Sequence, residues 1–553
     1  MGTCLGGRQQ RIVDSNGLRT RAGQWRTILA FRLWIRTPHR SERLQDPSQP
    51  QPPRPDASSP PRSAFARLAG LMPARRRNLA YLRLWFGRLT FWLGAVGVGL
   101  LAVVFAKLAD WFGDQFQLLH SEFPWIAWVL TPAGGVLLLW ITRRYFPGAE
   151  GSGIPQTLAH MSAPNAERPH PLLSLRIIVG KILVGAGAVG AGFSLGREGP
   201  TVQVGASLMH ELHKFLPRSL HVSREHLIVA GGAAGIAAAF NTPLAGIMFA
   251  IEEMTRSVGT RVSGLIIIAI VLAGVVSQAL TGGGHYFGHI LIAAETGDLL
   301  IWVIVASLAS GVAGGLFAKM LIKAALGWTG PIADFRRRRP LVFAAFCGLL
   351  IAAMGSLTAG AIFGTGYEPT RALLEGDADS LPWYFFFFKL AATFVSFLSG
   401  LPGGIFAPSL SIGAGLGHAL TYLLGNPEHA GMLLVLAMAG FLAAATQAPI
   451  TSFIIVMEMV DGYSKVIALM AVALFASWIS RLFCPPLYMT LARRYAPPPP
   501  PPAPPDALHV PPSAPAEAPS APAEAPSAPA EALAAPPPAS PDAARTPADP
   551  PRT

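Results

Sequence analysis

Long apolar runs separated by short polar breaks fill the chain between about residues 84 and 490. The runs lie at roughly 84–108, 124–142, 172–195, 200–216, 226–251, 262–281, 299–325, 340–362, 381–400, 404–424, 431–459 and 465–490. Several reach the roughly 20 residues that an α-helix needs to span a bilayer. Many are broken by Gly-Gly or Gly-x-Pro, which is tolerated at membrane depth only where the backbone is buried in protein or lines a cavity. The pattern predicts an all-α polytopic membrane protein with tilted, broken helices, more than twelve in all.

The composition agrees with a membrane protein. The chain has 553 residues, of which 51% are hydrophobic and 13% are charged. Soluble domains carry about 25% charged residues. The three cysteines, Cys4, Cys347 and Cys484, have the spacing of neither a disulfide framework nor a zinc site.

The two ends of the chain differ from its middle. Residues 1–80 are basic and include a Pro/Ser/Arg-rich stretch, and Met72 is an alternative start. Residues 496–553 are rich in Pro and Ala and repeat a seven-residue unit without aromatic residues. Such segments cannot bury a core. We expect a disordered N-terminal segment 1–80, a membrane domain 81–495 and a disordered tail 496–553.

Basic clusters predict the orientation in the membrane. The net charge of +13 comes largely from arginines near the N-terminus. A nucleic-acid-binding arm is one interpretation, but the positive-inside rule accounts for the same residues in a membrane protein, so no nucleic acid is expected. Basic clusters at 75–77, 143–144 and 336–339 fit one orientation, with both termini in the cytoplasm. The first span, 84–108, would then lead to an external loop holding Asp110, Asp114 and Glu122.

The membrane domain contains an internal repeat at a spacing near 207 residues. The repeated pairs are 196–210 with 404–418, 238–252 with 444–458, and 151–153 with 364–366. They divide the domain into halves at about 84–281 and 299–490. Repeated halves with broken helices are typical of secondary transporters, whose site lies between the halves near the bilayer midplane.

The two halves differ where ionisable residues occur. The first has Arg197-Glu198 where the second has Ile405-Phe406, and Glu253 aligns with Met459. A charge in an apolar run is costly and usually marks a pathway or site. Glu252 and Glu458 occur in both halves, which favours a structural role for them.

Glycine and proline mark three predicted helix starts, at 151–155, 196–200 and 403–408. Helix N-termini present free N–H groups and a partial positive charge, so several that converge can bind an anion. Ser152 and Tyr488 can add hydroxyl donors. The carboxylate of Glu198 would compete with the anion for the same N–H groups, and its protonation would open the path.

At these residues the chain resembles the CLC family of chloride channels and chloride/proton antiporters. The three family signatures are present as GSGIP at 151–155, GREGP at 196–200 and GGIFAP at 403–408. The run FNTPLAG at 240–246, the Glu252-Glu253 pair and the late Pro-Leu-Tyr488 are also similar. The resemblance is to the short prokaryotic members, because residues 496–553 hold no counterpart of the cytoplasmic CBS domains.

The resemblance implies a CLC-type inverted repeat and a homodimer with one pore per subunit. Ser152, Tyr488 and the amides of Ile405 and Phe406 would bind a central chloride. Glu198 would be the gating glutamate, and Glu253 the inner proton glutamate typical of antiporters. The selectivity motifs would comprise Gly151, Gly153, Pro155, Gly196, Arg197, Gly199, Pro200, Gly404 and Pro408. Ser152 favours chloride, since nitrate-selective relatives carry proline there.

The function expected from sequence is proton-coupled chloride transport in the bacterial inner membrane. The expected partners are chloride, protons and lipid, with no enzymatic activity, cofactor or metal. A passive, gated chloride channel on the same fold is the alternative. A membrane-embedded hydrolase would need a Ser/His or paired-Asp arrangement at membrane depth, and the sequence shows none there. A scaffold protein that acts through the Pro-rich tail is a weaker hypothesis.

Several polar residues have a simpler explanation than function. Lys181 and Lys389 lie in apolar runs, and each is expected to be an internal partner or a snorkelling side chain and not a ligand of the anion. Arg197 is expected to be structural or to tune the outer mouth electrostatically. The pair His210-x-x-His213 lacks a third ligand and fits a polar helix face better than a metal site.

Overall fold

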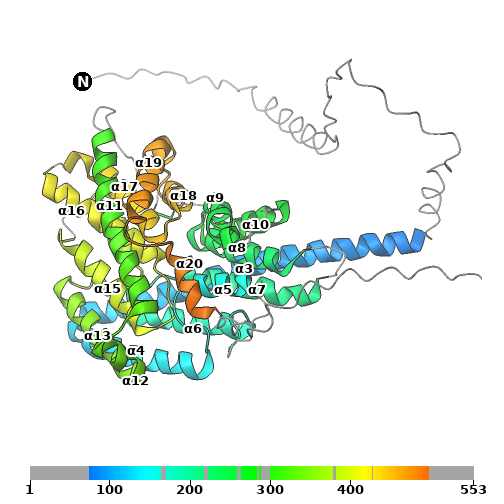
Figure 1. Cartoon of the computed structure of the whole chain (residues 1–553), viewed down its shortest axis with the longest axis horizontal. Helices are drawn as coiled ribbons and strands as arrows, with labels where there is room; N and C mark the ends of the chain where they lie inside the picture. Colours follow the sequence, from blue (N-terminus) through cyan, green and yellow to red (C-terminus); the bar gives the residue numbers. More distant parts are fainter. Residues whose placement is uncertain are drawn as a thin grey trace, which may run out of the picture. The chain divides into compact units, whose positions relative to one another are not determined.

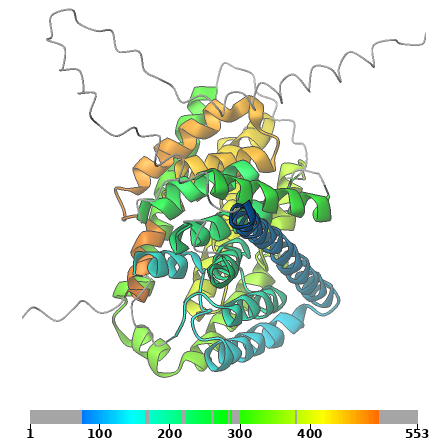
Figure 2. The ribbon, with the colours of Figure 1, turned by 90° about the vertical axis from the view of Figure 1, so that its right-hand side faces the viewer.

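The protein is built from helices that cross at many angles (Figures 1 and 2). The computed structural model describes residues 74–163, 170–216, 222–257, 263–282, 286–287, 299–377, 381–425 and 427–496. Within these ranges the backbone forms helices, with isolated β-bridges and no strand. The chain divides into residues 1–79 and 80–553, and the description below concerns the second part. Most of the predicted disordered segments, 1–80 and 496–553, lies outside the described residues, although the first helix begins at Ala74.

The first half of the membrane domain contains helices α3 to α10. They are α3 (Ala74–Glu122), α4 (Ala127–Tyr145), α5 (Ile154–Ser162), α6 (Leu175–Gly190), α7 (Glu198–Leu212), α8 (Arg224–Phe240), α9 (Pro243–Phe249), the π-helix η4 (Ala250–Met254) and α10 (Gly264–Thr281).

The second half contains helices α11 to α20. They are α11 (Leu299–Ile322), the π-helix η6 (Lys323–Gly327), α12 (Pro331–Arg338), α13 (Pro340–Leu357), α14 (Tyr367–Leu374), α15 (Phe385–Ser399), α16 (Phe406–Leu424), α17 (Ala430–Thr446), α18 (Pro449–Met459), α19 (Val466–Ser480), α20 (Leu487–Ala492) and the 3-10 helix η10 (Arg493–Tyr495).

Seven helices in the described residues are long and apolar enough to cross a membrane. Others are shorter and lie inside the protein, such as the nine-residue α5, most of whose side chains are buried. These short helices confirm the prediction of broken helices, because their free ends are shielded by protein. The centre of the fold is formed by α8 and α17, which are buried almost all round. A helix that is apolar on every face is expected in such a position.

The prediction for the first span was wrong in its length. We expected a helix over 84–108 followed by an acidic loop, whereas α3 continues without a break to Glu122. Asp110 therefore lies on the helix and forms an ion pair with Arg197. The acidic residues mark a polar surface of a long helix, and a hydropathy pattern cannot distinguish such a surface from a loop.

The two halves show the same construction. The pair α7 and α8 packs together as α16 and α17 do, and α9 packs against α18. Helix α8 ends at Asn241 with φ 58°, and its counterpart α17 ends at Gln447 with φ 59°. Gly151 and Gly364 both have φ 64°. The shared left-handed positions and matching packing confirm the inverted repeat.

Glu252 and Glu458 tie each half to the other. Glu252 of η4 accepts hydrogen bonds from the backbone N–H groups of Ile450 (3.2 Å) and Thr451 (2.7 Å) at the start of α18. Glu458 of α18 accepts from Leu244 (3.2 Å) and Ala245 (2.8 Å) at the start of α9. Each carboxylate thus caps the helix N-terminus of the opposite half, where negative charge is stabilising. The structural role predicted for both residues is confirmed.

Candidate anion site between helix N-termini

Two extended segments meet where the helices α7 and α16 begin. Gly196 and Gly404 exchange two backbone hydrogen bonds of 2.8 and 2.6 Å. Beside them, the N–H of Gly151 donates to the carbonyl of Leu401 at 3.2 Å, and the N–H of Gly403 donates to the carbonyl of Gly151 at 3.1 Å. These bonds hold the segments before α5, α7 and α16 together, so the three signature motifs lie at one place.

Glycine is required where these segments touch. A Cβ on Gly404 would lie 3.0 Å from the backbone nitrogen of Gly199, and a Cβ on Gly199 would lie 3.0 Å from the carbonyl oxygen of Ser152. Both distances are tighter than most Cβ contacts, so the neighbouring backbone would have to move by a few tenths of an ångström. Gly153 has φ 101°, which L side chains rarely adopt. The motif glycines therefore permit the close approach of the helix ends.

Glu198 lies at the first position of α7 and is completely buried. Its Oε2 accepts a hydrogen bond of 3.4 Å from the backbone N–H of Ala407, near the N-terminus of α16. Its Oε1 has no hydrogen-bond partner in the described part of the chain. The carboxylate thus occupies one of the N–H groups that the start of a helix leaves without an intrahelical acceptor. This is the position predicted for a competing anion.

The other predicted ligands lie beside the start of α16. The hydroxyls of Ser152 and Tyr488 are neighbours, and neither makes a hydrogen bond within the described residues. The ring of Tyr488 stacks on that of Phe406, with centroids 5.8 Å apart and planes 4° from parallel. Ile405 precedes the first residue of α16. Two buried hydroxyls beside a helix N-terminus can bind a small anion.

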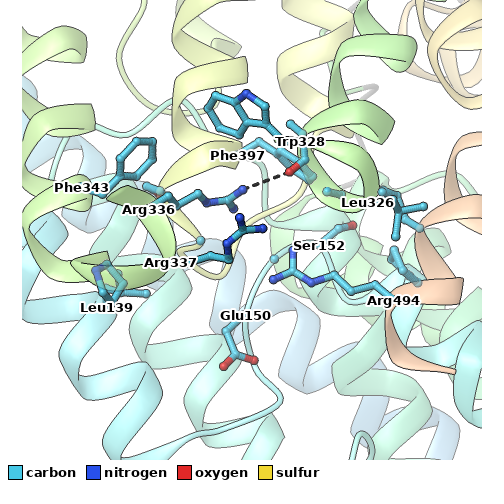
Figure 3. Close-up of a pocket in the computed structure, with 18 of the residues that line it drawn as sticks. Leu139, Glu150, Ser152, Leu326, Trp328, Arg336, Arg337, Phe343, Phe397 and Arg494 are labelled. Atoms are coloured by element: carbon cyan, nitrogen blue, oxygen red, sulfur yellow. Dashed lines mark hydrogen bonds between the residues drawn. The ribbon is translucent and has the colours of Figure 1, made fainter. Parts of the chain in front are cut away.

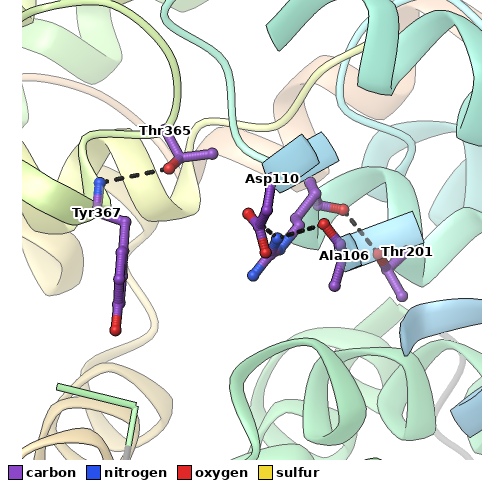
Figure 4. A network of polar contacts seen from close by, with 6 residues as sticks. Ala106, Asp110, Thr201, Thr365 and Tyr367 are labelled. Carbon is purple, nitrogen blue, oxygen red and sulfur yellow. Dashed lines mark hydrogen bonds and ion pairs between the residues drawn. The ribbon is translucent and has the colours of Figure 1, made fainter. Parts of the chain in front are cut away.

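Arg197 is anchored to α3 and does not point freely into the site. Its guanidinium donates to the backbone oxygen of Ala106 at 2.9 Å and forms an ion pair with Asp110 (Figure 4). Its carbonyl accepts from the hydroxyl of Thr201 at 2.8 Å. Arg197 also lines a cavity of about 530 Å³, which we call the acidic-side cavity, together with Asp110, Tyr286 and Thr365. The residue is thus structural, and it also contributes positive charge to this cavity.

A second cavity of about 450 Å³, the arginine-lined cavity, approaches the site from another side (Figure 3). Gly151, Ser152 and Pro155 line it. Glu198 lines neither cavity, and its neighbours Ser152 and Arg197 each line one of them. The Glu198 side chain is therefore enclosed by protein, next in sequence to one residue that lines the acidic-side cavity.

Glu253 is buried with 2% of its surface exposed, on the π-helix η4 that follows α9. Its Oε1 has no hydrogen-bond partner among the described residues. The adjacent Glu252 has three such bonds, two from backbone N–H groups and one from the Thr451 hydroxyl at 2.8 Å. The two neighbouring glutamates thus differ, because Glu252 is fixed by three hydrogen bonds, whereas one carboxyl oxygen of Glu253 has no partner in the described residues.

The buried lysines support the glycine motifs. Lys181 donates to the carbonyl of Gly151 at 2.5 Å. Its counterpart Lys389 donates to the carbonyls of Gly364 (3.0 Å) and Ile362 (2.8 Å). Both lysines thus have internal partners, as predicted. Each holds the glycine loop of its own half, at Gly151 in the first and Gly364 in the second.

Sequence reasoning missed several residues around the site. Tyr367 donates its hydroxyl to the backbone oxygen of Tyr286 at 2.9 Å, and the two rings pack edge to face. Both residues line the acidic-side cavity with Asp110. Tyr367 directly follows the repeated Gly364–Gly366 motif, which is the one signal in the sequence that could have indicated it. Away from these residues, His210, which the sequence pattern predicted to lie on a polar helix face, packs edge to face on His160, at 4.9 Å between ring centroids.

Comparison with known proteins finds a matching family model and a similar transporter. The family model described as voltage gated chloride channel matches residues 134–481. The H(+)/Cl(-) exchange transporter ClcA of Cronobacter sakazakii is 32% identical over 428 residues, which cover 73% of this chain and 88% of that protein.

Two solved structures have a similar fold and sequence. A slow cyanobacterial Cl-/H+ antiporter is 25% identical with a TM-score of 0.61, covering 73% of this chain and 98% of that one. A CLC-type fluoride/proton antiporter is also 25% identical with a TM-score of 0.59, covering 73% and 97%. Since the family model covers more than half of the chain, and the predicted motifs meet at one buried site, the chain belongs to the CLC family of voltage gated chloride channels.

Proposed function

We propose that this protein exchanges chloride for protons across a membrane, with Glu198 as the gate. The observation that carries the proposal is the position of the buried Glu198 carboxylate, which accepts a hydrogen bond from a backbone N–H near the N-terminus of α16. An ionised carboxylate and a chloride ion compete for the same partial positive charge. When Glu198 takes up a proton, its attraction to the N–H group falls and chloride takes its place.

Chloride binding would use the buried hydroxyls and the N-terminus of α16. Ser152 and Tyr488 have donors without partners in the described residues, and the amides of Ile405 and Phe406 lie at the same helix start. These donors carry no full positive charge. They bind an anion strongly enough for entry and weakly enough for release, as a transport site requires.

Coupling to protons is supported by Glu253. Its carboxyl group is buried and has one oxygen free of hydrogen bonds in the described part of the chain. It lies within electrostatic range of Tyr488, as Glu198 does. A proton would therefore pass between Glu198 and Glu253 on a route that diverges from the anion route near Tyr488.

The similar proteins named as antiporters support the same function. ClcA of Cronobacter sakazakii is named an H(+)/Cl(-) exchange transporter, and both similar structures are titled proton antiporters. One of these is titled a fluoride/proton antiporter. Serine at position 152 supports chloride as the anion here. Fluoride flux exceeding chloride flux in the same liposomes would contradict that choice.

A gated chloride channel is the second candidate, because the matching family model carries that description. Replacing Glu198 by Ala tests the gate in either case. We expect the variant to conduct chloride while proton movement falls to the level of protein-free liposomes. The reason is that the side chain that both competes for the site and carries the proton is gone. Loss of chloride flux in a folded variant would contradict the gate.

We also propose that the protein forms a homodimer in the bacterial inner membrane, with both termini in the cytoplasm. Exposed apolar side chains along α10 and α19 support a membrane or partner contact, including Val275 (51% exposed) and Trp478 (64% exposed). Cysteine pairs introduced on these faces should cross-link two copies in membranes. A protein that is monomeric in dilute detergent and transports chloride at an unchanged rate per copy in sparsely loaded liposomes would contradict the dimer.

A further inference from the structure

The arginine-lined cavity holds more positive charge than a chloride path needs. Four of its described lining residues are arginines: Arg143 at the end of α4, Arg336 and Arg337 on α12, and Arg494 on η10. Glu150 is the one carboxylate among the described lining residues, and it accepts a hydrogen bond from the backbone N–H of Gly148 at 2.9 Å. The cavity therefore has a clear excess of positive charge.

The arginines come from separate elements but point to one place. Figure 3 shows the guanidinium groups of Arg336, Arg337 and Arg494 converging between Trp328 and Glu150. Arg336 donates to the carbonyl of Ala324 at 3.1 Å, which fixes its direction. The positive-inside rule explains why basic residues lie on this face. It does not explain why three of them turn toward a common centre, where they repel one another.

The repulsion is reflected in Arg336, on the short helix α12 between two spans. Burial, and then the charges of Arg494 and Arg143, lower the pKa of its guanidinium to about 10. Arg337 has a partial partner in Asp334, one turn earlier on the same helix. Arg143 and Arg494 form no ion pair within the described residues. A cluster of this kind is stabilised by a multiply charged anion.

The size and walls of the cavity indicate the class of anion. A volume of about 450 Å³ is far more than a chloride ion fills and falls in the range of about 300–1,000 Å³ typical of organic ligands. Arginine forks bind phosphate oxygens in pairs, a geometry that a spherical ion does not use. The lining also includes Trp328, Phe343 and Phe397, and such rings can pack on a flat ligand group.

We propose that the arginine-lined cavity binds a polyphosphate anion, either free or as part of a nucleotide, and that the bound anion closes the path to Ser152. The binding claim is independent of transport. The closing claim rests on the proposed function, because it requires chloride to pass through this cavity.

Binding is tested on the purified full chain by calorimetry in low-chloride buffer, with pyrophosphate and ADP as separate probes. We expect saturable binding, weakened about tenfold or more in Arg337→Gln and Arg494→Gln, because each loses a charged hydrogen bond. Arg338→Gln is the matched control, since Arg338 lies on the same helix but does not line the cavity. It should bind like the unmodified protein.

The two probes distinguish the source of the phosphate. Tighter binding of ADP, with the advantage lost in Trp328→Ala, supports a nucleotide. Equal binding of both probes supports a free polyphosphate. No saturable binding of either probe, or binding unchanged in both arginine variants, would overturn the proposed site.

The closing claim is tested in liposomes that carry the protein, with the better-binding probe present on both sides. We expect chloride flux to fall in the unmodified protein and in Arg338→Gln, and to resist the probe in Arg494→Gln. Binding without any loss of flux would overturn the closing claim and leave the site intact. Absence of chloride flux without probe would instead count against the proposed function.

Discussion

At the residue scale, the proposed coupling of chloride to protons depends on two glutamates with different surroundings. One carboxyl oxygen of Glu198 accepts a hydrogen bond from the N–H of Ala407, and the other has no partner in the described residues. Glu253 has no such helix-terminal donor to its Oε1. Both are buried, with 0% of Glu198 and 2% of Glu253 exposed, and under the proposed function each would pass its proton to a neighbouring group.

Replacing Glu253 by Gln should uncouple the protein. Glutamine keeps the shape of the side chain and can form hydrogen bonds, but its amide group cannot take up a proton near neutral pH. We expect chloride flux to continue while proton flux falls to the background of protein-free liposomes, as recorded with a chloride electrode and a pH electrode together.

Glu252→Gln provides the matched control for that variant. Glu252 is the neighbouring glutamate, but it caps α18 and has no proposed role in proton transfer. Its variant should retain both fluxes if it folds. Proton flux that persists in Glu253→Gln would show that the proton role has been assigned to the wrong residue.

The residue scale also marks a limit of sequence reasoning. The glutamates, Ser152 and Tyr488 could be identified from motifs and from the asymmetry of the repeat. Asp110 could not, because its pairing with Arg197 joins positions far apart in the chain. Nothing local to either residue indicates such a contact.

At the scale of elements, the site depends on helix ends held at fixed positions. The starts of α7 and α16 are joined by the two hydrogen bonds between Gly196 and Gly404. The starts of α9 and α18 are capped by Glu458 and Glu252 from the opposite half. The repeat predicted a structural role for these two glutamates. It could not predict that each would cap the other half, because that exchange depends on how the halves are placed in space.

Removal of one reciprocal cap should destabilise the membrane domain. Glu252→Ala leaves the N–H groups of Ile450 and Thr451 without their acceptor, and hydrogen bonds to charged groups contribute about 1.5–3 kcal/mol each. We expect a lower melting temperature in detergent. Glu375→Ala is the control, because its pair with Arg371 is exposed and such pairs contribute about 0–1 kcal/mol. Equal melting temperatures for the two variants would contradict the capping role.

At the scale of the whole molecule, the inverted repeat accounts for both what could be predicted and what could not. The apolar runs and the glycine–proline motifs indicated a helical membrane protein with broken helices around a central site, and the structure has that architecture. The length of α3 and the convergence of α4, α12 and η10 on one cavity were not predicted. Both arise from packing between distant segments, which hydrophobic patterning does not encode.

The molecule as proposed has a frame shared by both halves and chemistry confined to one of them. Lys181 and Lys389 support matching loops, whereas Glu198 and Glu253 have the apolar counterparts Phe406 and Met459. The frame forms the anion site, and the two added carboxyl groups make anion movement depend on protons.

The most direct test of this account is a simultaneous record of chloride and proton movement in liposomes that contain the purified protein. A chloride gradient is imposed with equal pH on both sides, and valinomycin with potassium sets the membrane potential to zero. We predict that chloride leaving the liposomes drives protons inward, against the pH difference that they create. Chloride efflux without any proton movement would contradict coupled exchange and establish a channel.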